Sequence, residues 1–175
     1  IILFMLEYIG DVIMLDIINF LSSLAASLIT VAISHLISWR RDFNSSLAGL
    51  FAEVEKNSTI LEHILDIVQR DMELLRRGEL SLLPMLRLST SAYTYFIFRG
   101  YHKKLNKDTQ KAIIETYLSF DLVNEYLRLH EESKFGVMAF SVGANKLREK
   151  LLQVLKNIVQ ETLNKTKKLL ALRKS

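Results

Sequence analysis

A run of 23 residues without one formally charged side chain, Ile17 to Trp39, ends directly before Arg40 and Arg41. An α-helix rises about 1.5 Å per residue, so the run would form a helix about 34 Å long. The hydrocarbon core of a bilayer is about 30 Å thick, which such a helix can cross once. The run therefore predicts a single-pass membrane protein whose other parts must fold on one side of the bilayer or the other.

The charges are distributed unevenly around this run. All 23 Lys and Arg residues follow residue 39, whereas the first 39 residues carry three acids and no base. The remaining residues hold 23 bases against 16 acids. Basic residues that flank a membrane span stay on the cytoplasmic side, so we expect a cell-membrane protein with its N-terminus outside and its C-terminal domain in the cytoplasm. No basic segment precedes the run, which favours a retained anchor over a cleaved signal peptide.

We expect two parts, an outer arm with the transmembrane helix (1–41) and a cytoplasmic domain (42–175). The second part is long enough for one compact domain with its own core. The chain has one proline and six glycines, which argues against many tight turns between strands. It has no cysteine, which excludes disulfides, thiolate metal sites and cysteine nucleophiles.

Apolar residues recur with helical spacing along nearly the whole second part, which predicts an all-α fold. Asn44, Ser45 and Ser46 are candidates for a new helix start or a kink, Gly78 for a C-terminal cap, and Pro84 prevents simple continuation. Short connections favour antiparallel neighbours, so the prediction is an antiparallel bundle of about four helices after the transmembrane helix. The expected bundle helices cover about 47–77, 85–105, 109–133 and 137–173.

Polar and small residues within the apolar run share one face of the predicted helix, because they follow one another at steps of three or four. Small residues let membrane helices approach closely, and their hydroxyl or amide groups then bond across the contact. The alternative is that they bond to carbonyls of their own helix and face lipid. We call this set the polar face: Asn19, Ser23, Ser27, Thr30, Ser34 and Ser38.

Three acids, Glu7, Asp11 and Asp16, extend nearly the same face outward. In an oligomer they would form acidic rings that attract ions above a hydroxyl-lined path, which is the pattern of a cation channel. Acids beside a span are also an ordinary solvated flank that helps to set orientation. Both interpretations stay open at the level of the sequence.

Two amides interrupt otherwise apolar helix faces in the second part. Asn57 lies on the face of Val54 and Leu61, and Asn124 lies between Leu122 and Leu127. A buried amide needs hydrogen-bond partners and can fix the register of packed helices. We expect both amides to pair across helices, with each other or with the hydroxyls of the Thr90–Ser91 pair.

Short motifs give the chain a resemblance to a known group of proteins. The motifs are Glu53-Val-Glu-Lys-Asn57, Leu88-Ser-Thr-Ser-Ala-Tyr93, and Tyr117 with Asn124. They resemble a broad set of uncharacterised prokaryotic proteins that join an N-terminal membrane helix to a cytoplasmic helical domain. The resemblance covers about 41–132, implies a helical fold and carries no activity. The chain departs from the pattern at Tyr93, where tryptophan is the more usual residue.

No pattern in the sequence indicates catalysis or a cofactor. The four histidines complete neither a Glu-x-x-His nor a His-Glu-x-x-His spacing. There is no glycine-rich phosphate loop and no Gly-x-Ser-x-Gly elbow. We therefore expect a protein that is not an enzyme, with no catalytic residue, no metal ligand and no cofactor.

The basic C-terminal segment, 164–175, has two interpretations. Lys and Arg near the C-terminus of a helix interact favourably with the helix dipole. A basic cluster can also hold anionic lipid at the membrane surface. Nucleic acid is a disfavoured partner, because acids such as Glu161 interrupt the basic residues and no base-reading motif occurs.

The function expected from the sequence is that of a membrane-anchored helical scaffold or interaction protein. It would self-associate, or bind another membrane protein, through the polar face and the bundle. The alternative is an oligomeric cation channel with a cytoplasmic helical domain. The partner, the number of copies and the biological process stay open.

Overall fold

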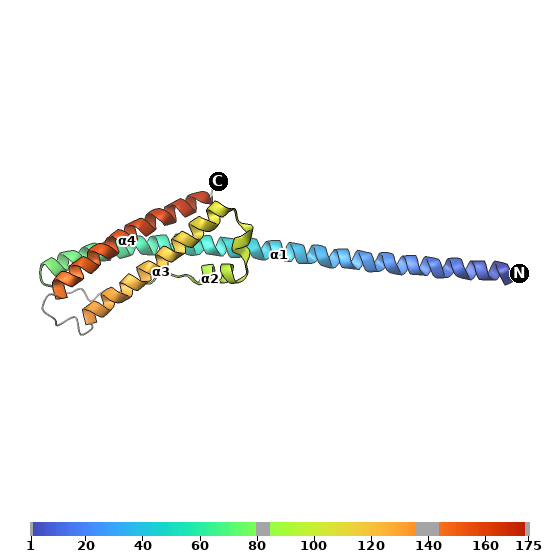
Figure 1. The fold of residues 1–175 in the computed structure, drawn as a ribbon, viewed down its shortest axis with the longest axis horizontal. Coiled ribbons are helices and arrows are strands. Elements are labelled where there is room, and N and C mark those ends of the chain that lie inside the picture. Colours follow the sequence, from blue (N-terminus) through green and yellow to red (C-terminus); the bar gives the residue numbers. More distant parts are fainter. Residues whose placement is uncertain (1, 80–84, 136–143, 174–175) are drawn as a thin grey trace. The chain divides into compact units, whose positions relative to one another are not determined.

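The computed structural model describes residues 2–79, 85–135 and 144–173. It contains the α-helices α1 (Ile2–Arg76), α2 (Ser91–Phe98), α3 (Lys107–Phe135) and α4 (Ala144–Leu172), and the 3-10 helix η1 (Tyr101–Lys104) (Figure 1). No strand occurs within these described residues, so the all-α class is confirmed.

The chain divides into two compact units, Ile1–Ser45 and Ser46–Ser175, a few residues later than the expected boundary at 41/42. Helix α1 contributes residues to both units. The new helix start considered at Asn44–Ser46 is wrong, because the backbone stays helical there. No proline interrupts the i→i−4 hydrogen bonds in this stretch, so nothing forces the helix to end.

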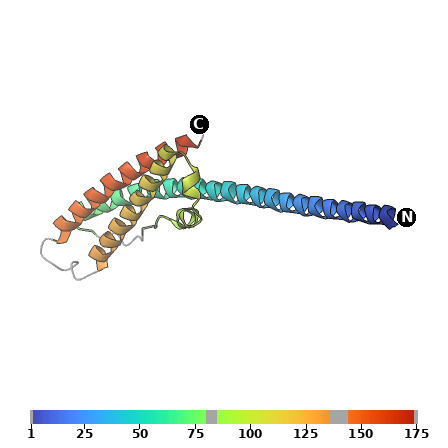
Figure 2. The ribbon, with the colours of Figure 1, turned by 45° about the vertical axis from the view of Figure 1, so that its right-hand side comes forward.

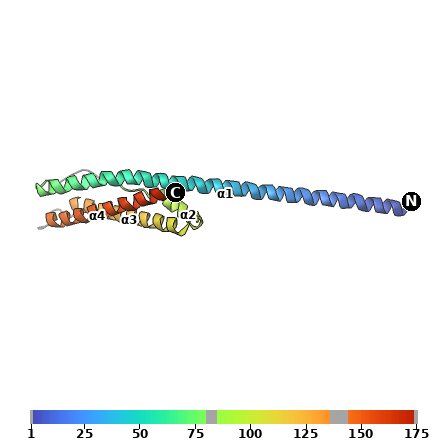
Figure 3. The same ribbon diagram turned by 90° about the horizontal axis from the view of Figure 1, so that it is seen from above.

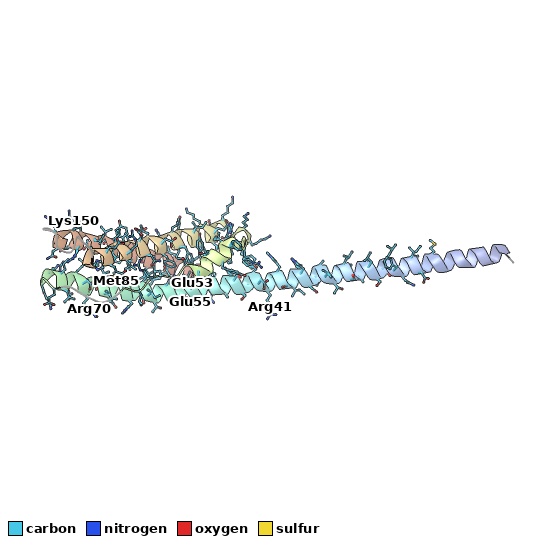
Figure 4. All side chains as sticks on the ribbon, turned by 90° about the horizontal axis from the view of Figure 1, so that it is seen from below. Arg41, Glu53, Glu55, Arg70, Met85 and Lys150 are labelled. Carbon is cyan, nitrogen blue, oxygen red and sulfur yellow. The ribbon has the colours of Figure 1, made fainter. Side chains whose placement is uncertain are left out.

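The first unit is a helix covered with exposed apolar side chains. Among the described residues, α1 is the one helix long and apolar enough to cross a membrane, and its apolar stretch is not buried by any other element. Phe20, for example, is 68% exposed and Leu28 is 61% exposed. Figure 4 draws the side chains of this apolar stretch as sticks, without another element of the described chain around them. So large an apolar surface requires lipid or another helix to cover it.

In the second unit, the α1 residues run parallel to α3. Glu53 of α1 contacts Tyr117 of α3, and Asp71, further along α1, contacts His130, further along α3. The segment between them runs in the opposite direction. Asn57 of α1 contacts Ser89, and Glu53, one turn earlier on α1, contacts Ala92, three residues later in the segment. The first three elements of the unit therefore run up, down and up, as expected for a bundle of sequential antiparallel neighbours.

Helix α4 runs antiparallel to α3 and completes the bundle. Lys165 in the last third of α4 bonds to Ser119 in the first half of α3, and Arg148 near the beginning of α4 bonds to Ser133 near the end of α3. Figures 1 and 3 both show α3 and α4 side by side. The core between the long helices is apolar and includes Leu50, Val54, Leu61, Ile64, Phe96, Ile113, Phe120, Leu127, Leu155 and Val159.

The helix expected over 85–105 is wrong over most of its length. Residues 85–90 are not helical, α2 has only eight residues, and Gly100, with φ of +68°, separates α2 from η1. In Figure 2 the short α2 is the yellow-green coil seen nearly end-on. Side-chain amides of α1 and α3 bond to the backbone of Leu88 and Ser89, and such bonds compete with helical ones.

The other helix ends follow local signals in the sequence. Gly78 has φ of +77°, and the N–H of Glu79 donates to the carbonyl of Leu74 at 2.9 Å, which is a Schellman end for α1. Asn106 caps α3, because its Oδ1 accepts the N–H of Thr109 at 2.7 Å. The expected start of the last helix at 137 and the position of Pro84 lie outside the described residues.

Candidate functional site

All six residues of the polar face are exposed in the first unit. Thr30 donates its hydroxyl hydrogen to the carbonyl of Ala26 at 2.8 Å, which is a bond within its own helix. Ser22, a neighbour of the polar face, does the same to the carbonyl of Asn19 at 2.9 Å. A hydroxyl bonded in this way can still accept a hydrogen bond from another helix, so the face keeps acceptor sites.

Of the three acids considered for ion attraction, Asp16 is exposed on α1. The side chains of Glu7 and Asp11 lie outside the described part of the structure. At about 100° per residue along the continuous helix α1, positions 7 and 11 lie away from the polar face and do not extend it as expected, whereas position 16 does. The channel interpretation therefore depends on the sequence alone for Glu7 and Asp11.

A buried carboxylate, that of Glu53 on α1, is the centre of the polar groups in the second unit. Its side chain is labelled in Figure 4 and is 8% exposed. Its Oε2 accepts the hydroxyl hydrogens of Ser89 and Ser91, at 2.6 and 3.0 Å, and the backbone N–H of Ala92 at 3.0 Å. Its Oε1 accepts the hydroxyl hydrogen of Tyr117 at 2.9 Å. One carboxylate thus joins α1, α3 and the segment before α2.

Glu53 also caps α2 from another helix. The first N–H groups of a helix have no partner inside the helix, and a side-chain oxygen usually satisfies one of them. Thr90, at the N-cap position of α2, makes no such bond. Glu53 instead accepts the N–H of Ala92, and that of Tyr93 at 3.4 Å. A negative charge at this end also interacts favourably with the helix dipole.

The hydrogen bonds keep Glu53 ionised despite its burial. Burial alone would raise its pKa, but the bonds from Ala92, Ser89, Tyr117 and Ser91 together hold the pKa below its ordinary value of 4.5. Burial, followed by the charge of Glu53, raises the pKa of Tyr117, which therefore stays protonated and donates. The Glu53 carboxylate therefore acts only as a hydrogen-bond acceptor, and the Tyr117 hydroxyl acts as its donor.

Asn57 and Asn124 each bind one residue of the segment before α2. Asn57, fully buried, donates to the carbonyl of Ser89 at 2.6 Å and accepts its N–H at 3.0 Å. Asn124 donates to the carbonyl of Leu88 at 3.0 Å and accepts its N–H at 2.8 Å. The expected partners, the other amide or the Thr90–Ser91 hydroxyls, are wrong for both, because backbone groups without helical partners compete for the amides. We call the two amides the amide clamp.

The residues that carry the resemblance described above therefore meet in one place. Glu53 and Asn57 lie one turn apart on α1, and they contact Ser89, Ser91 and the Ala92 N–H of the second motif. The role of the Glu53 carboxylate was missed from the sequence. The available signal was an acid on the helix face of Leu50 and Val54, which are fully buried.

A second buried polar pair was also missed. His130 Nε2 lies 3.2 Å from Asp71 Oδ2, and their side chains are 2% and 3% exposed. Nearby, Arg148 of α4 donates twice to the carbonyl of Ser133, at 3.0 and 2.7 Å. No local signal could reveal a pair 59 residues apart in the sequence.

Over the ranges that the structure covers, no group of three His, Asp or Glu residues could hold a metal ion.

The basic C-terminal segment is partly neutralised by acids of the same unit. Lys165 lies 2.8 Å from Glu161, and Arg173 lies 2.7 Å from Glu55. Lys167 lies 3.8 Å from Glu62. The charge available there for anionic lipid is therefore smaller than the sequence alone indicates.

The fold and these clusters define an all-α protein with one apolar N-terminal helix and a hydrogen-bonded network inside its second unit. No protein-family model matches the chain, and neither the curated proteins nor the solved structures include one that matches it. Its function must therefore be inferred from its own geometry.

We expect Glu53→Gln to destabilise the second unit by about 2 to 3 kcal/mol at neutral pH, because bonds to a charged acceptor are lost. The folded-state pKa of Glu53 is depressed, so its ionised form stabilises the fold above the ordinary value of 4.5. This contribution is lost as the pH falls through the lower folded-state pKa. Unfolding free energies of the full chain in detergent, from circular dichroism across acidic pH, measure it. The matched control is Glu73→Gln, an exposed acid of the same helix. The expectation is contradicted if the stability difference between the wild type and Glu53→Gln does not shrink in acid.

We expect Asn57→Leu to cost about 3 kcal/mol, because it removes a fully buried amide and leaves the N–H and carbonyl of Ser89 without their partner. Asn124→Leu should cost less, about 1 to 2 kcal/mol, because the side chain of Asn124 is only half-buried. Hydrogen exchange at the Ser89 and Leu88 amides should accelerate in the respective variants. Exposed Asn164 on α4 provides the control, Asn164→Leu, with little change. Unchanged exchange at both amides would show that the clamp does not hold this segment.

Proposed function

We propose that the protein is a membrane-anchored helical scaffold that self-associates, or binds another membrane protein, through the polar face. The observation that carries the proposal is the arrangement of six small or polar side chains on one exposed face of a helix. The rest of that helix surface is formed largely by exposed leucine, isoleucine and valine. In a bilayer, a helix with such a face gains from packing it against another helix, where backbones approach closely and polar groups find partners.

The interior of the second unit supports a scaffold more than a catalyst. The oxygens of Glu53 already accept hydrogen bonds from hydroxyl and backbone donors, and Asn57 uses its donor and its acceptor on Ser89. Groups engaged in this way hold helices together and are not poised to bind or transform a substrate. Under the proposal, the second unit keeps a defined shape that a partner can recognise.

We further propose that the second unit lies in the cytoplasm, at the cell membrane. The support is the pair Arg40–Arg41 directly after the apolar run, together with the absence of bases among the first 39 residues. Protease added to sealed inside-out vesicles should digest the chain after Arg41, and right-side-out vesicles should protect that part. The reverse pattern of protection would overturn the orientation.

Ser27→Leu and Ser34→Leu should each weaken self-association by roughly fivefold or more, because each removes a polar contact worth about 1 kcal/mol and blocks close approach. The measurement is the mass of the detergent-solubilised complex as a function of concentration. The matched controls are Ala25→Leu and Ala32→Leu, which enlarge small residues on the opposite side of the same helix. Equal effects at both sides would contradict a specific polar face, and a monomeric wild type would remove self-association.

The absence of cysteine allows a direct check of the same contact. Under oxidation in the membrane, Ser27→Cys should give a disulfide-linked dimer and Ala25→Cys should not.

The competing function, an oligomeric cation channel, requires ion flux that depends on the acids before the apolar run, whereas the scaffold does not. Cation flux through liposomes that contain the protein should then fall when Glu7→Gln and Asp11→Asn are combined. A confirmed oligomer without flux favours the scaffold.

A further inference from the structure

The segment that joins the two halves of the bundle, Ser91 to Lys104, presents aromatic side chains that are exposed among the described residues of the second unit. We call this segment, which comprises α2, Gly100 and η1, the elbow. Helix α2 has the sequence SAYTYFIF and carries no charged residue. Phe96 is fully buried, but Phe98 is 87% exposed and Tyr95 is 50% exposed. Exposed large aromatic side chains on a helix without charged residues are typical of a surface that another molecule or a membrane covers.

The elbow holds its exposed aromatics in a fixed position. Tyr95 and Phe98 are three residues apart, so they share one side of the helix. On the buried side, the rings of Phe96 and Tyr101 pack edge to face with centroids 5.8 Å apart. Glu53 caps the beginning of α2. The exposed aromatics are therefore carried by an element that is anchored at its beginning and by its buried face.

Basic residues follow the exposed aromatics directly in the chain. Residues 99–111 contain five bases against one acid, whereas the turn at the opposite end of the bundle, 70–79, contains three bases and three acids. Lys103, Lys104 and Lys107 are all exposed. Exposed aromatic residues next to several lysines are typical of segments that lie in the interface of an anionic membrane.

The elbow is attached close to the start of the second unit. Tyr117, which stacks on Tyr93 of α2, bonds to the carbonyl of Leu50, and Glu53 bonds to α2 itself. Leu50 follows Trp39, the last residue of the apolar run, by eleven residues. Eleven residues span about 16 Å as a helix and at most about 40 Å fully extended. The length of this connection therefore limits how far the attachment point of the elbow can lie from any membrane that the apolar run crosses.

We propose that the elbow docks on an anionic bilayer surface, with Tyr95 and Phe98 in the headgroup region and the neighbouring lysines against anionic lipid headgroups. The proposal rests on the membrane anchoring proposed above and is independent of self-association. A second copy of the chain is the other occupant to consider. It fits less well, because the same basic residues on both copies would repel each other.

The test uses the full chain in sealed vesicles of phosphatidylcholine, alone or mixed with phosphatidylglycerol in both leaflets. The chain contains no cysteine, so Phe98→Cys takes a single environment-sensitive fluorophore, and lipids brominated on their acyl chains report contact by quenching. We expect quenching in the anionic vesicles that falls at high salt. Lys103→Gln combined with Lys107→Gln should lower the ratio of docked to undocked elbow by roughly 30-fold. Phe98 and both lysines are exposed, so these changes leave the core intact.

Two controls are matched to these variants. Leu147→Cys labels another exposed apolar residue, on α4 and outside the elbow, and should show no quenching. Lys146→Gln with Lys150→Gln removes two exposed lysines of α4 and should leave docking unchanged. Absence of quenching at position 98 in anionic vesicles, or equal quenching at position 147, overturns the proposal. A second copy covers the surface instead if the fluorescence of the label reports less exposure to water as the protein-to-lipid ratio rises, while brominated lipids do not quench it. Flotation of the chain with the vesicles measures anchoring separately, so a failure to float rejects the anchoring itself.

Discussion

The hydrogen bonds of the Glu53 carboxylate are the interaction on which the second unit depends. A carboxylate that is 8% exposed is costly to bury unless donors surround it, and here hydroxyl and backbone donors from two other parts of the chain, 89–93 and α3, do so. The same bonds give α2 its cap and hold it beside α1. The ionised carboxylate and the start of α2 therefore stabilise each other, and neither would be satisfied alone.

The amide clamp explains why the second unit is a bundle with one unusual element. Leu88 and Ser89 use their backbone groups on Asn124 and Asn57 and not on a helix of their own. The helix that follows them, α2, is only eight residues long. Its side with Tyr95 and Phe98 is exposed among the described residues.

The two units meet different physical requirements. The first is a helix whose apolar surface has no internal partner, so its surroundings must supply the contacts. The second buries its own core and pairs several of its surface charges internally, such as Arg173 with Glu55. The first unit and the elbow therefore both leave apolar surface for external contacts, while the rest of the second unit buries its own core.

The sequence by itself determined the apolar run, the helical class, and the end of a helix at Gly78, because these follow from hydrophobic length, periodicity and local backbone chemistry. It also indicated Asn57 and Asn124 as amides on apolar faces. Only the tertiary structure decided what those amides bind, why 85–105 is not one helix, and how Asp71 meets His130. These outcomes depend on groups tens of residues apart in the chain, and no local propensity can report which distant backbone groups a buried side chain will satisfy.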